Sequence, residues 1–174
     1  QAHPGNAKDI MQNPVRIIAD ICASWPENKL PETTCGREGF ICFIGANADF
    51  EKGVLNAMAR DFDENLLQSH LALLEAIIKE KRLKYPGSVI DFEVSYPYKN
   101  MKPMIDKHPQ ILKLAKEAFE ECGLNAESQP IRGGTDGANL SYMGLPTPNI
   151  DAGYGTPHGP FEWTSLDMMD KITR

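Results

Sequence analysis

The longest helical pattern in the chain begins after Asp63 and stops before Pro86-Gly87. Its apolar residues recur at the three- and four-residue spacing of one helix face. They are Leu66, Leu67, Leu71, Leu74, Ile77 and Ile78. Asp63 is a good N-cap residue, and the basic run from Lys79 to Lys84 suits the negative end of the helix dipole. The pattern predicts a long amphipathic helix that must cover something with its apolar face.

Four further patterns surround this helix. A shorter helix is expected from about Pro14 to Ser24, since proline suits the first helical position. A continuous apolar run from Gly39 to Gly45 and an alternating run from Gly53 to Asp61 predict two strands, paired antiparallel through a turn at Ala46 to Lys52. Val89 to Ser95 also alternates and predicts another strand.

The order of these elements is helix, strand, strand, helix, strand. It matches a ferredoxin-like β-α-β-β-α-β unit without its first strand. Only two residues precede His3, so most of that strand is expected upstream, and a neighbouring strand would be left with unpaired backbone groups. We expect this first domain to cover residues 1–97.

Residues 96–103 contain two prolines and no periodic pattern, as a linker between domains does. Beyond them, Pro109 to Gly123 predicts a helix, and short strand candidates at Ala126 to Ile131 and Thr147 to Ile150 flank a glycine-rich turn and a short helix. This second domain, residues 98–174, has α/β character, yet about 75 residues with so few strands form a poor independent core. The predicted class is α+β, with a second domain that is part of a larger α/β domain.

Composition excludes several functional classes. The chain has 18 basic and 24 acidic residues and a net charge of −6, and its basic residues are scattered, which argues against a nucleic-acid partner. No apolar run approaches the roughly 20 residues needed to cross a bilayer. The four cysteines lack C-x-x-C spacing and are expected to be free structural residues, although two disulfides remain open. We expect a soluble, cytoplasmic protein in a reducing compartment.

Two histidines stand in loops rich in proline and glycine. His3 comes directly before Pro4-Gly5, where a surface histidine is the simplest interpretation. His158 lies between Pro157 and Gly159, with Glu162 four residues further on. Such a loop can present one metal ligand from a stiff scaffold with the acid behind it, and a purely structural loop is the alternative.

An arginine and an asparagine are the other candidates. Arg132 precedes Gly133-Gly134 in a turn that opens a helix, and the exposed backbone N–H groups of such a turn suit an anion. The alternative is an ordinary strand-to-helix turn capped by Thr135 or Asp136. Asn100 lies in the linker, where its amide could bond a substrate or cap a local turn.

Taken in order, these segments resemble peptidase T, the tripeptide aminopeptidase family. Its pattern has a His-Pro-Gly-x-Ala-Lys segment opening a lid, an Arg-Asp-Phe-Asp strand end and a Tyr-x-Asn-Met linker. It continues with an Ile-Arg-Gly-Gly-Thr-Asp-Gly-Ala turn, a Met-Gly-Leu-Pro-x-Pro-Asn strand and a His-Gly-x-x-Glu loop. The matching residues are His3 to Lys8, Arg60 to Asp63, Tyr98 to Met101, Ile131 to Ala138, Met143 to Asn149 and His158 to Glu162. The match covers nearly the whole chain.

The resemblance implies a role for each candidate residue. His158 would bind zinc through a neutral imidazole, and Arg132 would hold the carboxylate terminus of a peptide through its bidentate guanidinium. His3 would reach into the active site of the other subunit and stabilise the oxyanion on the scissile carbonyl. Asn100 would help near the same carbonyl. The implied cofactor is a pair of zinc ions in each active site of a homodimer that associates through the lid.

The resemblance also implies a longer parent enzyme. The family's metal chemistry uses a His-x-Asp ligand pair, a bridging aspartate, an adjacent Glu-Glu and one further carboxylate. None is recognisable here, since the one Glu-Glu pair, Glu120-Glu121, lies in the polar end of a helix. The chain would then be a carboxyl-terminal fragment, inactive alone, that carries the lid and the end of the catalytic domain. The rival functions are a non-catalytic association module of ferredoxin-like fold and an anion-binding module built on Arg132 and Gly133-Gly134.

Overall fold

The computed structural model describes residues 3–174 and divides into two units. The first unit ends at Ser95 and the second runs from Tyr96 to Arg174, so the division falls in the linker region. Helices and two small antiparallel sheets make up the described residues, and the fold is therefore α+β, as predicted.

The first unit begins with a short 3-10 turn, η1 (Pro4–Asn6), and the helix α1 (Pro14–Ser24). The bounds of α1 are the predicted ones. Asn13 is its N-cap, and the side-chain oxygen of Asn13 accepts a hydrogen bond from the Val15 amide at 3.0 Å. Pro14 occupies a position whose amide has no partner inside a helix, which is why proline begins the helix without cost.

Two further 3-10 turns, η2 (Glu27–Lys29) and η3 (Pro31–Thr33), lead into a hairpin of β1 (Phe40–Ala48) and β2 (Gly53–Arg60). The strands pair antiparallel as predicted, with Ile41 opposite Ala59. The strand β1 continues through Ala48, so the turn is shorter than the expected Ala46 to Lys52.

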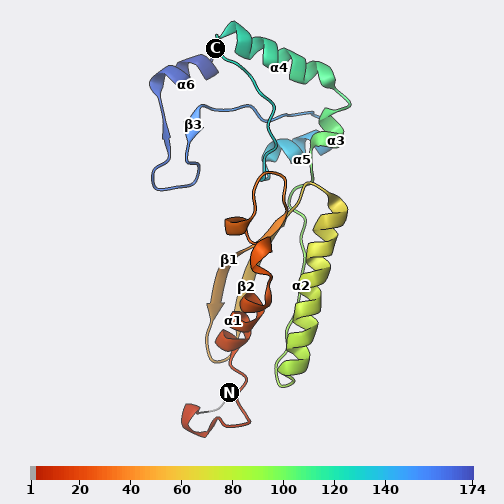
Figure 1. The fold of residues 1–174 in the computed structure, drawn as a ribbon, viewed down its shortest axis with the longest axis vertical. Coiled ribbons are helices and arrows are strands. Elements are labelled where there is room, and N and C mark those ends of the chain that lie inside the picture. The colour runs from red at the N-terminus through yellow and green to blue at the C-terminus, as the bar shows by residue number, and fades with distance from the viewer. Residues whose placement is uncertain (1–2) are drawn as a thin grey trace. The chain divides into compact units, whose positions relative to one another are not determined.

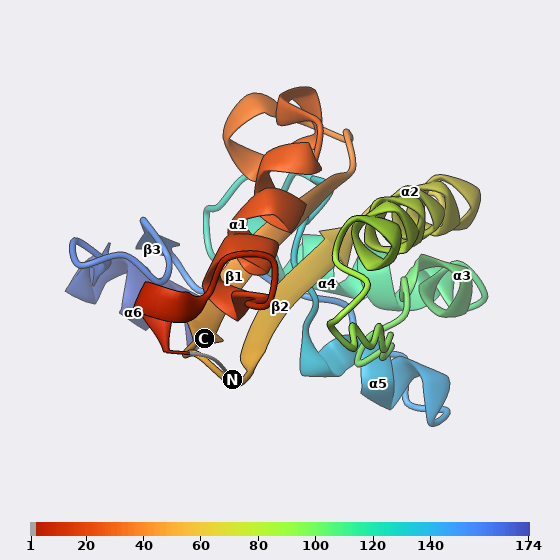
Figure 2. The same cartoon turned by 90° about the horizontal axis from the view of Figure 1, so that it is seen from below.

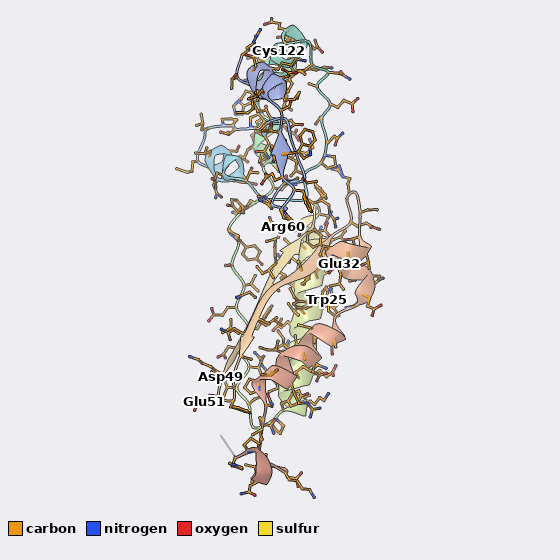
Figure 3. All side chains as sticks on the ribbon, turned by 90° about the vertical axis from the view of Figure 1, so that its left-hand side faces the viewer. Trp25, Glu32, Asp49, Glu51, Arg60 and Cys122 are labelled. Atoms are coloured by element: carbon orange, nitrogen blue, oxygen red, sulfur yellow. The ribbon has the colours of Figure 1, made fainter. Side chains whose placement is uncertain are left out.

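The short turn is held by one carboxylate. Asp49 Oδ1 accepts hydrogen bonds from the amides of Lys52 at 2.9 Å and Glu51 at 2.7 Å. These two N–H groups hold the pKa of Asp49 below its ordinary value. Figure 3 shows Asp49 and Glu51 together at this end of the hairpin.

The long helix α2 (Glu64–Lys84) follows, and Asp63 caps it as predicted. Its Oδ1 accepts hydrogen bonds from the amides of Asn65 at 2.8 Å and Leu66 at 3.1 Å. Both α1 and α2 run along the same side of the hairpin (Figures 1 and 2). Between them lies one apolar cluster, made of Ile17, Ile21, Trp25, Ile41, Leu74, Ile77 and Ile78. Burying these faces is what holds the first unit together.

The strand predicted at Val89 to Ser95 is not present. Ile90 and Phe92 pack against the apolar cluster, but Val94, which the alternating pattern also predicts to face inward, is exposed, and this segment forms no ladder with any described residue. The Ile90 carbonyl oxygen instead accepts a hydrogen bond from Arg82 Nε at 2.7 Å. A strand exists only beside a partner, and the ferredoxin-like arrangement of the first unit therefore stays a prediction.

The second unit contains α3 (Lys102–Ile105), α4 (Pro109–Glu121), α5 (Asp136–Tyr142) and α6 (Leu166–Ile172). A two-residue ladder joins β3 (Tyr154–Gly155) to β4 (Trp163–Thr164). Gly123 follows α4 with a φ of 72°, the left-handed conformation that ends many helices.

Two predicted strands of the second unit are wrong. Neither Ala126 to Ile131 nor Thr147 to Ile150 belongs to a strand, and the β3–β4 pair is the one ladder among the unit's described residues. The expected α/β sheet is therefore not formed within this part of the chain. Both segments lack a neighbouring strand, and an apolar pattern without a partner cannot make a ladder.

The four cysteines are free, as predicted. None of the helices in the described part of the chain combines the length and apolar character that crossing a membrane requires.

A small ionic cluster joins α1 to the end of α2. Asp20 Oδ2 accepts hydrogen bonds from Lys84 Nζ at 2.8 Å and the Tyr85 hydroxyl at 2.9 Å, and Lys81 Nζ lies 3.4 Å from Oδ1. The bond from Lys84, followed by that from Tyr85, lowers the pKa of Asp20 to about 2. The carboxylate is thus stabilised in its charged form by groups of the other helix.

We expect this cluster to make stability pH-dependent. Because the pKa of Asp20 is depressed in the folded state, its contribution is complete above its ordinary value of 3.8 and is lost as the pH falls toward about 2. Asp20→Asn should therefore lower the urea midpoint at about pH 6 and lower it much less at about pH 2. Trp25 fluorescence in a Trp163→Phe background reports on the first unit. A Glu75→Gln control removes an exposed pair within α2 and should show a smaller effect. An Asp20→Asn difference independent of pH would contradict the assignment.

Gly39 lies where no side chain fits. A Cβ at this position would overlap the Asp61 carboxylate and lie 2.7 Å from His70 Nε2. These two side chains form a buried pair, with His70 Nε2 3.1 Å from Asp61 Oδ2. Gly39→Ala should therefore destabilise the first unit by about 1–3 kcal/mol through overpacking.

Gly45→Ala is the matched control, because the nearest atom to its added Cβ lies at 3.8 Å. Urea unfolding followed by Trp25 fluorescence measures both variants. Equal midpoints for the two variants would show that the Asp61–His70 pair adapts without cost.

Candidate functional site

His3 is the N-cap of η1 and is exposed to solvent. Its ring nitrogen Nδ1 accepts a hydrogen bond from the Gly5 amide at 3.1 Å, and its carbonyl accepts one from the Asn6 amide at 2.8 Å. The Pro-Gly turn noted in the sequence thus holds both the backbone and the ring of His3.

The segment that follows Arg132 is tied to a second motif of the sequence. The Thr135 hydroxyl donates to Asn149 Oδ1 at 2.9 Å. Gly137 packs so closely on residues 147–149 that a Cβ there would lie 2.6 Å from the Thr147 carbonyl oxygen. The segment that begins α5 and the Met143–Asn149 segment therefore pack against each other.

The predicted cap of α5 is only partly observed. Thr135 occupies the N-cap position, but its side chain makes no capping bond because its hydroxyl is used on Asn149. Asp136 is the first helical residue, and its Oδ1 lies 3.5 Å from the Tyr98 hydroxyl. The start of α5 is thus held both by Tyr98 of the linker and by the bond between Thr135 and Asn149.

Asn100 caps a local turn. Its Oδ1 accepts a hydrogen bond from the Lys102 amide at 3.0 Å, where α3 begins. Its carbonyl accepts one from the Tyr142 hydroxyl at 3.1 Å, which ties the linker to the last residue of α5. Of the two uses open to this amide in the sequence, the structure shows the capping one, and it engages the side-chain oxygen.

His158 stands in the loop between β3 and β4 and is exposed. Its φ is 62°, a left-handed conformation that is uncommon for a residue with a side chain. The loop is closed by backbone hydrogen bonds from Gly159 to Thr156 at 3.2 Å and from Glu162 to Gly159 at 3.1 Å. At its base, a Cβ on Gly155 would lie 2.5 Å from Trp163 Nε1, so the indole packs directly on this glycine. The loop presents the imidazole to solvent from a hydrogen-bonded frame.

Two of the three candidate residues of the second unit, Arg132 and Asn100, lie near opposite ends of α5. Arg132 precedes α5, and Asn100 is bonded to the other end of α5 through Tyr142. His158 is carried separately by the β3–β4 loop. His3 belongs to the first unit.

These residues do not make a metal site by themselves. Catalytic zinc is held by three protein ligands and structural zinc by four. Among residues 3–174, no three His, Cys, Asp or Glu side chains gather closely enough to hold a metal ion. His158 is therefore a single candidate ligand.

One buried polar pair of the first unit was not predicted from the sequence. His70 and Asp61 pair at 3.1 Å with side chains only 7% and 3% exposed, and the Trp25 ring meets the His70 ring edge-on at 6.4 Å. A signal was present, because His70 precedes Leu74 by four residues and so lies on the apolar face of α2. Its place on that face indicates burial against the hairpin.

No family model matches the chain. The curated protein peptidase T of Staphylococcus saprophyticus is 42% identical over 172 residues, which are 99% of this chain and 42% of that protein. Peptidase T of Vibrio cholerae serotype O1 is 42% identical over 97% of this chain and 41% of its own length. The chain thus spans about two fifths of the length of the curated relatives it matches.

A solved structure shares the fold. The crystal structure of aminopeptidase PepT from Bacillus cereus superposes with a TM-score of 0.60 at 17% sequence identity, covering 99% of this chain and 49% of that one. At this identity the likeness concerns the fold alone. The sequence identity along 97–99% of its residues shows that the chain is homologous to part of peptidase T, about two fifths of its length.

Proposed function

We propose that this chain is part of a zinc-dependent aminopeptidase that removes the N-terminal residue of tripeptides. The observation that carries the proposal is the 42% identity to a peptidase T over 99% of the chain. The motif segments agree with it, because the structure packs the Arg132 turn and the Met143–Asn149 segment against each other. The relatives are more than twice as long, so the activity belongs to the whole protein.

Arg132 is proposed to bind the carboxylate terminus of the tripeptide. A guanidinium offers parallel N–H groups that match a carboxylate, and this makes it the side chain of choice for such a terminus. The turn that follows it is braced by the Thr135–Asn149 bond and by the close packing of Gly137. A braced turn keeps the start of the arginine side chain in one place, which binding at a fixed distance from the scissile bond requires.

His158, His3 and Asn100 are proposed to act around the scissile bond. His158 would contribute one zinc ligand, since a neutral imidazole on a stiff loop suits that task. His3 would donate to the oxyanion that forms on the carbonyl, in the active site of the partner subunit of a dimer. Asn100 would act through its amide nitrogen, because its oxygen accepts from Lys102.

The cofactor is proposed to be a pair of zinc ions in the full-length enzyme. His158 is the one zinc ligand that the resemblance implies in this chain, and the described residues hold no cluster of three such side chains, so we expect the 174-residue chain to be inactive alone. The homodimer through the first unit and the cytoplasmic location are further parts of the proposal. The net charge of −6 argues against a nucleic acid as the partner.

Activity should be measured with and without added zinc for this chain and for the full-length protein that contains it. We expect tripeptide hydrolysis by the full-length protein alone, lost on treatment with a chelator and restored by zinc. Hydrolysis by the isolated chain would mean that a complete ligand set has been overlooked. Inactivity of both would favour the association module.

Arg132→Ala in the full-length protein should lower kcat/KM for tripeptides roughly 10- to 150-fold, the range of one to a few charge-assisted hydrogen bonds. The same substitution should hardly change kcat/KM for a tripeptide amide, which lacks the carboxylate. Arg16→Ala, an exposed arginine of α1, is the matched control. An equal loss for both substrates would assign Arg132 a structural role.

A further inference from the structure

The turn after His3 contains an interaction that the proposed roles do not use. The Gly5 amide donates to His3 Nδ1 at 3.1 Å. A ring nitrogen that accepts a hydrogen bond carries a lone pair, so a neutral imidazole in this arrangement has its proton on Nε2. The turn therefore selects one of the two neutral tautomers of His3.

We propose that Gly5 is a positioning residue that holds His3 as the Nε2–H tautomer and so determines which atom the ring offers to an oxyanion. The proposal rests on the proposed function for the use of that atom, but the tautomer itself does not depend on any activity. Nε2 lies on the far side of the ring from Nδ1, so the proton points away from the turn.

The Gly5 amide can donate to the His3 ring because no other group of the turn accepts from it. The first amides of a helical turn have no partner within it. His3 is the N-cap residue and Pro4 has no amide hydrogen, so Gly5 supplies the first N–H of η1. The bond from Asn6 to the His3 carbonyl at 2.8 Å closes the same turn and keeps the ring over the Gly5 amide.

Gly5 also leaves room for the ring. A Cβ at this position would lie 3.2 Å from His3 Nδ1 and 3.3 Å from Cε1, closer than ordinary contact. Gly5 is not among the glycines with positive φ, so its backbone conformation is open to alanine. Space for the imidazole is therefore what glycine provides here, and Gly5→Ala should displace the ring without straining the backbone.

The tautomer matters for the chemistry of an oxyanion. An oxyanion accepts hydrogen bonds, so the group facing it must donate. With Nδ1 engaged by Gly5, Nε2–H is such a donor in the neutral ring. A proton on Nδ1 would set two donors face to face and break the bond to Gly5.

The test is ¹⁵N NMR of the histidine side chains in the labelled 174-residue chain at about pH 8, where an ordinary imidazole is neutral. We expect His3 to show a protonated Nε2 and an unprotonated Nδ1, and Gly5→Ala to shift His3 toward a mixture of tautomers. His108 is an internal control, because it also precedes a proline as an N-cap but makes no side-chain capping bond. Gly45→Ala is a control variant that should leave His3 unchanged.

An Nδ1–H tautomer for His3 in the unsubstituted chain would overturn the proposal, as would the same His3 spectrum in Gly5→Ala. In the full-length protein, Gly5→Ala should lower kcat for tripeptides roughly 10- to 100-fold with little change in KM, as expected when an oxyanion donor is misplaced. An unchanged kcat in an active enzyme would overturn the positioning role. Absence of activity before any substitution would count against the proposed function only, since the NMR result still decides the tautomer.

Discussion

Ile41 is completely buried, and the two long helices of the first unit pack on the face of the hairpin that it occupies. A two-stranded hairpin is marginal in water, because it has too little apolar surface to bury by itself. α1 and α2 supply that surface, and the Asp20 cluster ties the two helices to each other. The Asp61–His70 pair, which joins the end of the hairpin to α2, depends on this packing.

Interactions near in sequence were predictable, and those far apart were not. The bounds of α1 and the caps at Asn13 and Asp63 agree with the sequence, because an N-cap and the amides it binds lie two or three residues apart. In the segment Val89 to Ser95, Ile90 and Phe92 pack inward as the alternation predicts, but Val94, also expected inward, is exposed, and no strand forms. Which side chains face a core is a local property of the pattern, whereas a ladder needs a partner that the pattern does not name.

The candidate site residues show the same difference between local features, which the sequence predicts, and contacts between distant residues, which it does not. The sequence predicts turns at His3 and His158, and the structure shows them, but Arg132 was expected at the end of a strand that does not form. The sequence does not show that the Asn100 side-chain oxygen binds the Lys102 amide, since an asparagine that binds a substrate and one that caps a turn have the same sequence pattern. Nor did it identify the Asp61–His70 pair, because a histidine on an apolar helix face reveals its partner only when the hairpin is folded against it.

A common feature recurs in the segments that hold or adjoin the candidate residues. Gly5 admits the His3 ring, Gly137 admits the Thr147 carbonyl and Gly155 admits the Trp163 ring, each at a distance that a Cβ would violate. In each case the missing side chain allows a close contact that helps to fix the segment. Such loops can hold a polar side chain in one orientation while leaving it open to solvent, which burial could not do. Close contacts at these glycines thus fix local segments, whereas the core around Ile41 holds the first unit together.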